Sequence, residues 1–251
     1  MKLIRDTWLI FSRQMLMMWR EPVWVFFGLA QPITYLLLFA PMLKLALHVG
    51  TTTDAYLVYV PGLLSVLVIL GGMYTGFGLL AELRAGVIER SRVTPVSRVS
   101  LMVGRALREV VTLLGQSLVI TVLALPFGLR VGLVDLLLAY LLLSLLSFMA
   151  VALSYGLTLK VRSEAALGPM INTLGQPVML LAGVLLPLTL APLWLKKIAD
   201  ANPFYWSTNA MRALFKGHIG DPSVWQALII VGVLMVVSMI WSVRLFARSY
   251  Q

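Results

Sequence analysis

The charged residues with the most specific spacing lie in one passage, between Glu82 and Arg105. Gly86 is followed there by a run of mixed charges around Glu89, and the run ends at Thr94-Pro95. Because glycine and proline interrupt helices, we expect a charged helical extension, a break near Gly86, a short charged helix and a stop at the proline. Such a surface favours docking of another protein over chemistry on a small molecule, with a plain solvated connector as the alternative.

Residues for other kinds of chemistry are scarce. The sequence has no G-x-x-x-x-G-K-[ST] loop, so the chain does not bind ATP in the P-loop manner by itself. It has no cysteine, which excludes disulfides, thiolate nucleophiles and iron–sulfur ligands. Its two histidines, His48 and His218, lie far apart in sequence, and we expect ordinary surface histidines and no metal site.

The elements that must position the charged passage are six windows without Asp, Glu, Lys or Arg. They cover 22–43, 55–81, 110–129, 136–159, 165–195 and 222–243. A bilayer core needs roughly 20 apolar residues per helical crossing, so each window is long enough to span once. Barrel strands would alternate in polarity over about 10 residues, which these continuous runs do not. Hydrophobic residues make up 60% of the chain.

We therefore predict an all-α integral membrane protein with one domain over 1–251. Its six transmembrane helices are expected at 22–43, 55–81, 110–129, 136–159, 165–190 and 222–243. A cytoplasmic loop over 82–108 and an external segment over 191–221 would connect them. The net charge of +10 does not indicate nucleic-acid binding, because the charges lie between the windows, as topology determinants do.

The distribution of Lys and Arg predicts the orientation. With six spans both termini share one side, and that side holds fourteen of these residues against six on the other. The positive-inside rule then places both termini and the 82–108 loop in the cytoplasm of a plasma-membrane protein. Four of the six external charges fall in 196–221, the segment for which the count is weakest.

The fifth window is longer than one span requires. Pro169, Pro177, Pro187 and Pro192 interrupt 165–195. A full helix followed by an apolar turn that dips back from the outer surface would use this length, and a single tilted, kinked helix is the alternative.

Residues 2–21 are predicted to form an amphipathic helix in the membrane interface. At about 100° per residue one face is aromatic and Met-rich, and the opposite face is charged. The apolar face holds Ile4, Trp8, Phe11, Met15, Met18 and Trp19; the polar face holds Lys2, Asp6, Arg13 and Arg20. The helix is either a passive anchor or a lever that contacts a cytoplasmic partner.

Polar residues are few within the apolar windows. The candidates for a substrate path are Thr34, Tyr35, Gln116, Asn172 and Gln176, and Ser117 is a further polar group. Interhelical hydrogen bonding is the more common role of such residues. Gly72 and Gly76 fit the small-xxx-small pattern, which we assign to packing within the chain rather than to a dimer seam. The lack of intramembrane charge argues against a proton-coupled carrier.

The charged passage resembles the G-x-x-E/D-R…P-x-x-R…G-R/K pattern that follows the second span of ABC-2 type transporter permeases. The matching residues are Gly86, Glu89-Arg90, Pro95, Arg98 and Gly104-Arg105. A second block resembles the family's passage between spans five and six, with Gly183, Pro187, Pro192, Trp194, Asn202-Pro203, Arg212 and Gly217. The likeness covers the chain in order and is greatest to daunorubicin-resistance-type efflux permeases. At 81–84 many relatives have a denser Glu-Arg-Glu cluster, so the role of Glu82 follows less directly.

The resemblance implies that a separate cytoplasmic ATPase binds ATP and Mg, and that two permease chains assemble with two ATPase chains. The implied ATPase-coupling residues are Glu82, Arg84, Gly86, Glu89, Arg90, Arg92, Pro95 and Arg98, with the interfacial helix (Trp8, Phe11, Arg13, Met15 and Trp19) beside them and the 160–164 turn as a secondary contact. The implied external gate holds Pro187, Pro192, Trp194, Asn202, Pro203 and Arg212.

Three functions are compatible with these features. The chain is the permease of an ATP-driven exporter of hydrophobic or amphiphilic compounds, the permease of an exporter of polysaccharide or another lipid-linked polymer, or a carrier, channel or membrane enzyme that needs no ATP. The windows rich in Leu, Val and Met favour lipophilic cargo.

Overall fold

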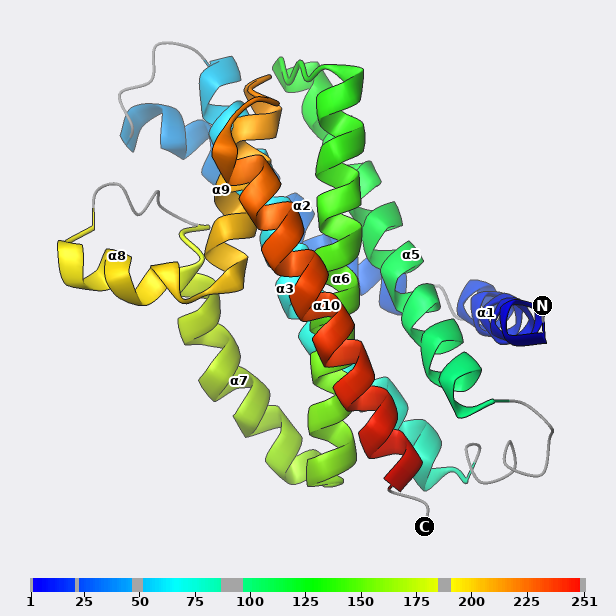
Figure 1. Ribbon diagram of the computed structural model, residues 1–251. Helices are drawn as coiled ribbons and strands as arrows, with labels where there is room; N and C mark the ends of the chain where they lie inside the picture. Colours follow the sequence, from blue (N-terminus) through cyan, green and yellow to red (C-terminus); the bar gives the residue numbers. More distant parts are fainter. Residues whose placement is uncertain (1, 21–22, 47–51, 87–96, 185–190, 249–251) are drawn as a thin grey trace.

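Long α-helices form nearly all of the described chain in the computed structural model (Figure 1). The structure describes residues 2–20, 23–46, 52–86, 97–184 and 191–248, and these contain no strand. The helices are α1 (Lys2–Arg20), α2 (Val23–Ala46), α3 (Thr52–Arg84), α5 (Arg98–Ala124), the short 3₁₀ helix η1 (Leu125–Phe127), α6 (Leu133–Val161), α7 (Glu164–Leu181), α8 (Leu193–Asp200), α9 (Pro203–Phe215) and α10 (Pro222–Arg248). The all-helical prediction is confirmed.

Four helices of the described chain are long and apolar enough to cross a membrane. They are Ala55–Arg84, Arg98–Phe127, Leu133–Val161 and Pro222–Arg248, and they coincide with the second, third, fourth and sixth charge-free windows. The first window coincides with α2, in which Phe26–Leu38 is a shorter apolar stretch. The fifth coincides with α7, which has 18 residues and contains Pro169 and Pro177. Crossing by α2 and α7, and hence the count of six, stays a prediction.

Helix α5 begins within the passage that the sequence assigned to the cytoplasmic loop. Its first residue is Arg98, and the side chain of Ser97 caps it by accepting a hydrogen bond from the Ser100 amide at 3.0 Å. The cap satisfies one of the free amides of the first turn. The predicted 82–108 loop is therefore helical from Arg98 onward, and Arg105 and Arg108 lie on α5.

Helices α3 and α6 lie at the centre of the bundle and meet through small residues. Gly72 lies against Ala150, and the backbone amide of Gly76 donates to Ser154 Oγ at 2.9 Å. Without a side chain at either glycine the two helices approach closely, as small-xxx-small helices do in membranes. The prediction that Gly72 and Gly76 pack within the chain is confirmed. On its other side, α6 packs against α10, where Gly156 lies under the ring of Trp241.

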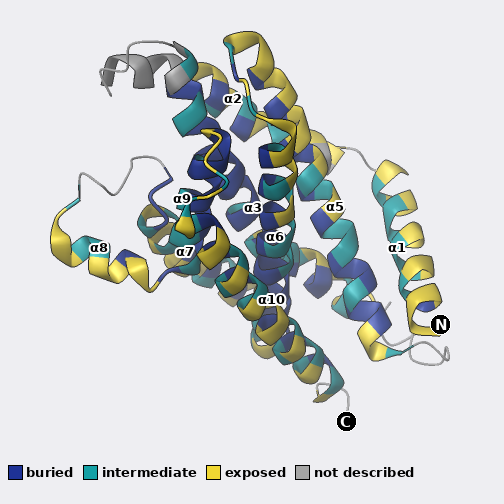
Figure 2. Cartoon of the chain, turned by 45° about the horizontal axis from the view of Figure 1, so that its top comes forward, coloured by how far each residue is buried: buried dark blue, intermediate teal, exposed yellow. Residues whose placement is uncertain are grey.

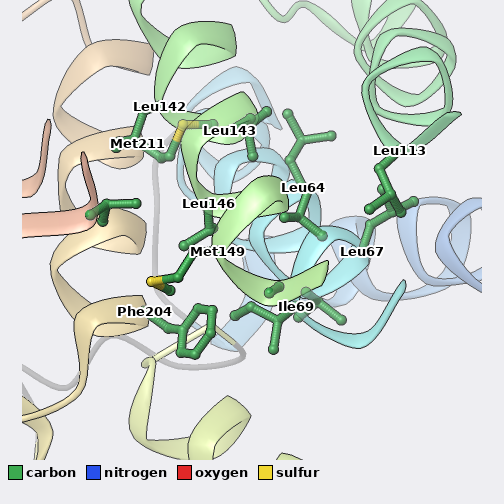
Figure 3. Close-up of a cluster of buried hydrophobic side chains, with 14 of the residues drawn as sticks. Leu64, Leu67, Ile69, Leu113, Leu142, Leu143, Leu146, Met149, Phe204 and Met211 are labelled. Atoms are coloured by element: carbon green, nitrogen blue, oxygen red, sulfur yellow. The ribbon is translucent and has the colours of Figure 1, made fainter. Parts of the chain in front are cut away.

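The interior of the bundle is filled by large apolar side chains from α3, α6 and α9. Leu64 and Ile69 of α3 lie near Leu146 of α6, and Met211 of α9 packs nearby (Figure 3). All four are buried to at least 99%. Because lipid tails are as apolar as these residues, van der Waals packing rather than escape from water holds such helices together.

The helix ends gather into two groups (Figure 1). The end of α3, the start of α5, the α6–α7 junction and the end of α10 lie together, and we call this the basic end because its residues (82–86, 97–109, 160–164 and 244–248) are rich in Arg and Lys. The starts of α3, α6 and α10 lie at the opposite end. Helix α1 runs along the outside of α5, while α8 projects from the bundle and is mostly exposed (Figure 2).

Candidate functional site

A buried ion pair joins three helices at the basic end. Glu82, near the end of α3, lies 2.6 Å from Nη2 of Arg105 on α5, and the Arg105 side chain is only 6% exposed. The second carboxylate oxygen of Glu82 accepts a hydrogen bond from Gln14 Nε2 of α1 at 3.1 Å. A charge buried to this extent must be paired. One carboxylate therefore fixes the relative positions of α1, α3 and α5.

A second pair lies one turn further along α5. Arg108 and Glu109 bond to each other and are each less than a quarter exposed. Two arginines and two glutamates thus balance their charges in this part of the bundle. The sequence singled out Arg105 through the resemblance and did not single out Arg108 or Glu109. The i, i+3 and i+4 spacing from Arg105, which places all three on one helix face, is the signal that was available.

An exposed ion pair at the basic end joins the end of α3 to the start of α7. Arg84 Nη1, at the end of α3, lies 2.6 Å from Glu164 Oε2, the first residue of α7. Gly86 follows with φ of 65°, a left-handed conformation that favours glycine, so the predicted break near Gly86 is confirmed. Arg98 Nη1 donates to the Ala247 carbonyl of α10 at 2.9 Å.

The remaining residues predicted for ATPase coupling, Glu89, Arg90, Arg92 and Pro95, lie outside the described residues. The structure therefore places Glu82, Arg84, Gly86 and Arg98 at one end of the bundle. It also turns Glu82 inward to Arg105, whereas the sequence suggested an outward docking residue.

Helix α1 packs against the bundle with a face that coincides only in part with the predicted apolar face, since it includes Met18 but leaves Trp8 and Trp19 exposed. Ile10 lies against Gly104, the Ser100 hydroxyl donates to the Leu3 carbonyl, and Thr112 contacts Met18. Ser100 and Gly104 are four residues apart on α5 and Thr112 is eight residues further on, so the contacts form a seam along α5.

The predicted apolar face of α1 lies beside that seam and is largely uncovered. Trp8 is 61% and Trp19 73% exposed, while Phe11 and Met15 are partly buried. Arg13 is exposed, as a residue of the polar face should be. Asp6, which the pattern placed on the polar face, is instead 6% exposed, because the seam extends over it. An uncovered apolar face with basic residues beside it suits a helix in the membrane interface.

A pocket of about 200 Å³ lies between α2, α3 and α7. Its wall is mostly apolar and aromatic with a few polar groups, and it is formed by Gln31, Tyr35, Tyr59, Leu63, Val66, Leu70, Gln176, Met179 and Val184. The Tyr59 hydroxyl donates to the Tyr35 carbonyl at 3.3 Å, and Gln31 Nε2 donates to the Tyr35 hydroxyl at 3.2 Å. An apolar wall with a few polar groups is typical of small-molecule sites.

The five candidate path residues fall into two groups. Tyr35 and Gln176 both line this pocket, although they are far apart in sequence. The other three lie elsewhere: Thr34 bonds the Ala30 carbonyl of its own helix, Gln116 is buried against Gly28 of α2, and Asn172 accepts a hydrogen bond from the Tyr74 hydroxyl at 2.9 Å. Asn172 therefore makes an interhelical hydrogen bond, which is the more common role of a polar residue within an apolar helix. The pocket residues Gln31 and Tyr59 were not identified from sequence.

The segment predicted as external contains two helices. Pro192 precedes α8, on which Trp194 is 64% exposed, and Pro203 is the first residue of α9. Asn202 caps α9 by accepting from the Phe204 amide at 3.1 Å. Pro187 and the predicted dipping turn over 185–190 lie outside the described residues.

Arg212 lies in the last turn of α9 and points back to the end of α7. Its Nη2 donates to the Gly183 and Val184 carbonyls at 2.7 and 3.2 Å. Burial lowers the pKa of Arg212 to about 10, so the guanidinium remains charged at neutral pH. Of the predicted external residues, Asn202 and Arg212 are thus brought to α7, while Trp194 is not.

The described residues contain no group of three or more His, Cys, Asp or Glu side chains that could hold a metal ion. What the arrangement offers is a pocket between loosely covered helices, an ion-paired basic end and a set of backbone contacts at the other end of α7. These features suit the binding and movement of a molecule.

Comparison with known proteins shows the family of the chain. Residues 5–216 match the family described as ABC-2 type transporter. The protein ycf38 of Cyanophora paradoxa is 24% identical over 216 residues, which cover 84% of this chain and 74% of that protein. The ycf38 protein of Pyropia yezoensis is 26% identical over 217 residues, covering 85% and 75%. The names of both relatives describe a transport permease.

Proposed function

Because the chain belongs to the ABC-2 type transporter family, we propose that it is the membrane-spanning permease subunit of an ATP-driven exporter. Its cargo is a hydrophobic or amphiphilic compound such as a drug, an antibiotic or a lipid-like molecule. The chain forms the translocation path and catalyses no reaction of its own. It resides in the plasma membrane with both termini in the cytoplasm, as the distribution of Lys and Arg indicates.

The pocket between α2, α3 and α7 supports this cargo class. Leu63, Val66 and Leu70 line one side of it, and the tyrosines and amides are confined to a few positions. A polysaccharide path would need many hydrogen-bonding groups along its wall to replace the water on the sugar hydroxyls. The aromatic and aliphatic lining instead matches a lipophilic body, with Gln31 and Gln176 available for one or two polar groups.

The energy comes from a separate subunit in this proposal. A cytoplasmic ATPase binds ATP and Mg, and its movement acts on the basic end of the permease. The predicted coupling passage follows Glu82, which is bonded to both Arg105 and Gln14, so a push on that passage is passed directly to α1, α3 and α5. ATP drives transport only if ATP and cargo each bind the inward- and outward-open states with different affinity.

Two permease chains and two ATPase chains form the complete transporter in this proposal. The uncovered side chains of α2 and α7 support a second permease copy. Gln31 and Gln176 are exposed on helices that we place in the membrane. Amide groups facing hydrocarbon are costly unless protein or water covers them. A second copy of the chain, or a water-filled path between two copies, would cover this side.

The family match over 5–216 carries the permease assignment, and co-purification with the ATPase tests it. The chain should purify from membranes together with a P-loop ATPase. Exchanging the charges by Glu89→Arg with Arg90→Glu should leave membrane insertion intact and remove most of the bound ATPase. Arg130→Glu, an exposed residue at the opposite end, is the control and should retain it. Full retention of the ATPase and of its stimulated hydrolysis by the exchange variant would disprove the coupling assignment.

A further inference from the structure

The end of α7 is held by side chains of α9 that bind its backbone carbonyls. Arg212 Nη2 reaches the carbonyls of Gly183 and Val184, and its Nε lies 3.5 Å from the Val58 carbonyl of α3. Asn202 Nδ2 donates to the Val178 carbonyl at 2.8 Å. The last carbonyls of a helix have no partner within that helix and need one from elsewhere. Arg212 supplies a partner for the Gly183 and Val184 carbonyls just beyond α7, and Asn202 adds a second donor to the Val178 carbonyl, which also accepts from the Ala182 amide.

Space for these contacts is provided by a glycine on α3. A Cβ atom at Gly62 would lie 2.8 Å from the Val184 carbonyl oxygen and 3.6 Å from Arg212 Nη2. Even an alanine at this position would therefore displace the Val184 carbonyl. Three helices, α3, α7 and α9, meet at one guanidinium group, and we call Arg212, Asn202 and Gly62 the carbonyl clamp.

Helix α7 has few other attachments in the described chain. Only Leu167, Ile171 and Gly175 are buried on it, and these lie toward its first two-thirds. At the basic end its first residue, Glu164, pairs with Arg84, and midway Asn172 bonds Tyr74. A helix with so little buried surface is free to tilt, and its polar contacts decide which neighbours move with it.

Arginine suits this position better than any other cation. Its planar guanidinium presents several N–H donors in a fixed fork, so one side chain reaches carbonyls on two helices at once. A lysine would carry the same charge as a single point on a flexible stem. The contacts also differ from an ordinary ion pair, because Arg212 donates to backbone carbonyls.

We propose that Arg212 is a positioning residue that locks the end of α7 to α9, so that a tilt of α7 begun at Glu164 is delivered to the external segment. The locking is a property of the chain alone. The delivery rests on the proposed function, because it requires an ATPase that moves the basic end.

The locking is tested with a cysteine reporter in the purified chain, which has no native cysteine. Val184→Cys places one thiol beside the clamp, where the side chain is 3% exposed, and a water-soluble maleimide measures how often it opens. Losing hydrogen bonds from a charged group should raise the rate of labelling about tenfold in Arg212→Gln. Arg212→Lys and Gly62→Ala should also raise it, and Arg130→Gln should not.

A second reporter separates local opening from unfolding. Met102→Cys lies near the start of α5 at the basic end, where the side chain is fully buried, whereas the clamp lies near the start of α3. Its labelling rate should be the same with Arg212 and with Arg212→Gln. Unchanged labelling of Val184→Cys in Arg212→Gln would overturn the locking. Equal acceleration at both reporters would also overturn it, because Arg212 would then stabilise the whole fold.

The delivery is tested on the complex with the ATPase, trapped with ATP and vanadate. Trapping should change the labelling rate of Val184→Cys several-fold when Arg212 is present and should leave it unchanged in Arg212→Gln. The same response in both would overturn the delivery while the locking stands. If the chain binds no ATPase at all, the proposed function fails, and the labelling of the isolated chain still decides the locking.

Discussion

At the scale of single residues, the ion pairs at the basic end differ sharply in their surroundings. Glu82 and Arg105 are 26% and 6% exposed, while Arg84 and Glu164 are 54% and 61% exposed. Removing one member of a buried pair leaves an uncompensated charge, whereas an exposed pair is replaced by water at little cost. The two pairs have similar lengths in the structure, so burial alone should separate their effects.

We predict that Glu82→Gln lowers the free energy of unfolding by about 3 kcal/mol, since Arg105 would lose its counter-charge. Glu164→Gln is the matched control, because it is the same change in an exposed pair, and its effect should stay within about 1 kcal/mol. Thermal unfolding of both variants in the same detergent measures the difference. Equal shifts for the two variants would contradict the role assigned to burial.

The residues of the candidate site show where prediction from one sequence ends. The pattern around Gly86 predicted a helix, a break and a charged surface, and the break is present. It did not predict that Glu82 would turn to Arg105, because hydrophobic spacing says which residues avoid lipid and not which charges meet. Arg212 was identified from the resemblance, but its carbonyl partners come from a helix almost thirty residues away in sequence.

At the scale of helices, the contact between α3 and α6 depends on glycines that have no room for a side chain. A Cβ at Gly76 would overlap Thr158 Oγ1 and would lie 2.7 Å from Ser154 Oγ. Gly78, on the same helix, has no atom of another residue within 4 Å of its Cβ position. The two glycines thus differ only in whether α6 lies against them.

We predict that Gly76→Ala lowers the stability of the chain by about 1–3 kcal/mol, because the added methyl group must push α6 away. Gly78→Ala should be neutral or should raise the stability by up to about 1 kcal/mol, since alanine favours the helix. Comparison of unfolding midpoints in one detergent is sufficient. A larger loss at Gly78 than at Gly76 would show that the seam lies elsewhere.

The seam between α1 and α5 makes a similar prediction. A Cβ at Gly104 would lie 2.9 Å from Ile10 and 3.0 Å from the Thr7 carbonyl. Gly104→Ala should therefore loosen α1, and amide hydrogen exchange within 3–18 should become several-fold faster. Gly115→Ala, in the same helix but with open space around it, serves as the control. Unaltered exchange in Gly104→Ala would mean that α1 is held by other contacts.

The helices themselves were largely predictable, for a physical reason. Charge is so costly in hydrocarbon that four of the charge-free windows coincide with long apolar helices. The ends of the helices were less predictable, because the charged first turns of α5 continue the helix beyond the window, to Arg98. The helical spacing of the apolar residues predicted the extent of α1. It placed Asp6 on the wrong face, because a pattern of apolar residues does not show where polar residues contact a neighbouring helix.

At the scale of the whole molecule, the bundle consists of a tightly packed centre and loosely attached flanks. Helices α3 and α6 bury much of their surface, largely against each other, whereas α7 and α8 keep most of theirs exposed (Figure 2). The pocket lies between the centre and this flank. A transporter needs such a division, because one part must move against another while the site between them opens to each side in turn.

The central claim is that the chain moves a lipophilic compound only when a separate ATPase drives it. The most direct test is uptake of a lipophilic fluorescent dye into inside-out vesicles that contain the chain with its ATPase partner. Dye should accumulate only with ATP, with both subunits present and with an intact P-loop in the partner. ATP-independent accumulation by vesicles that contain this chain alone would contradict the account.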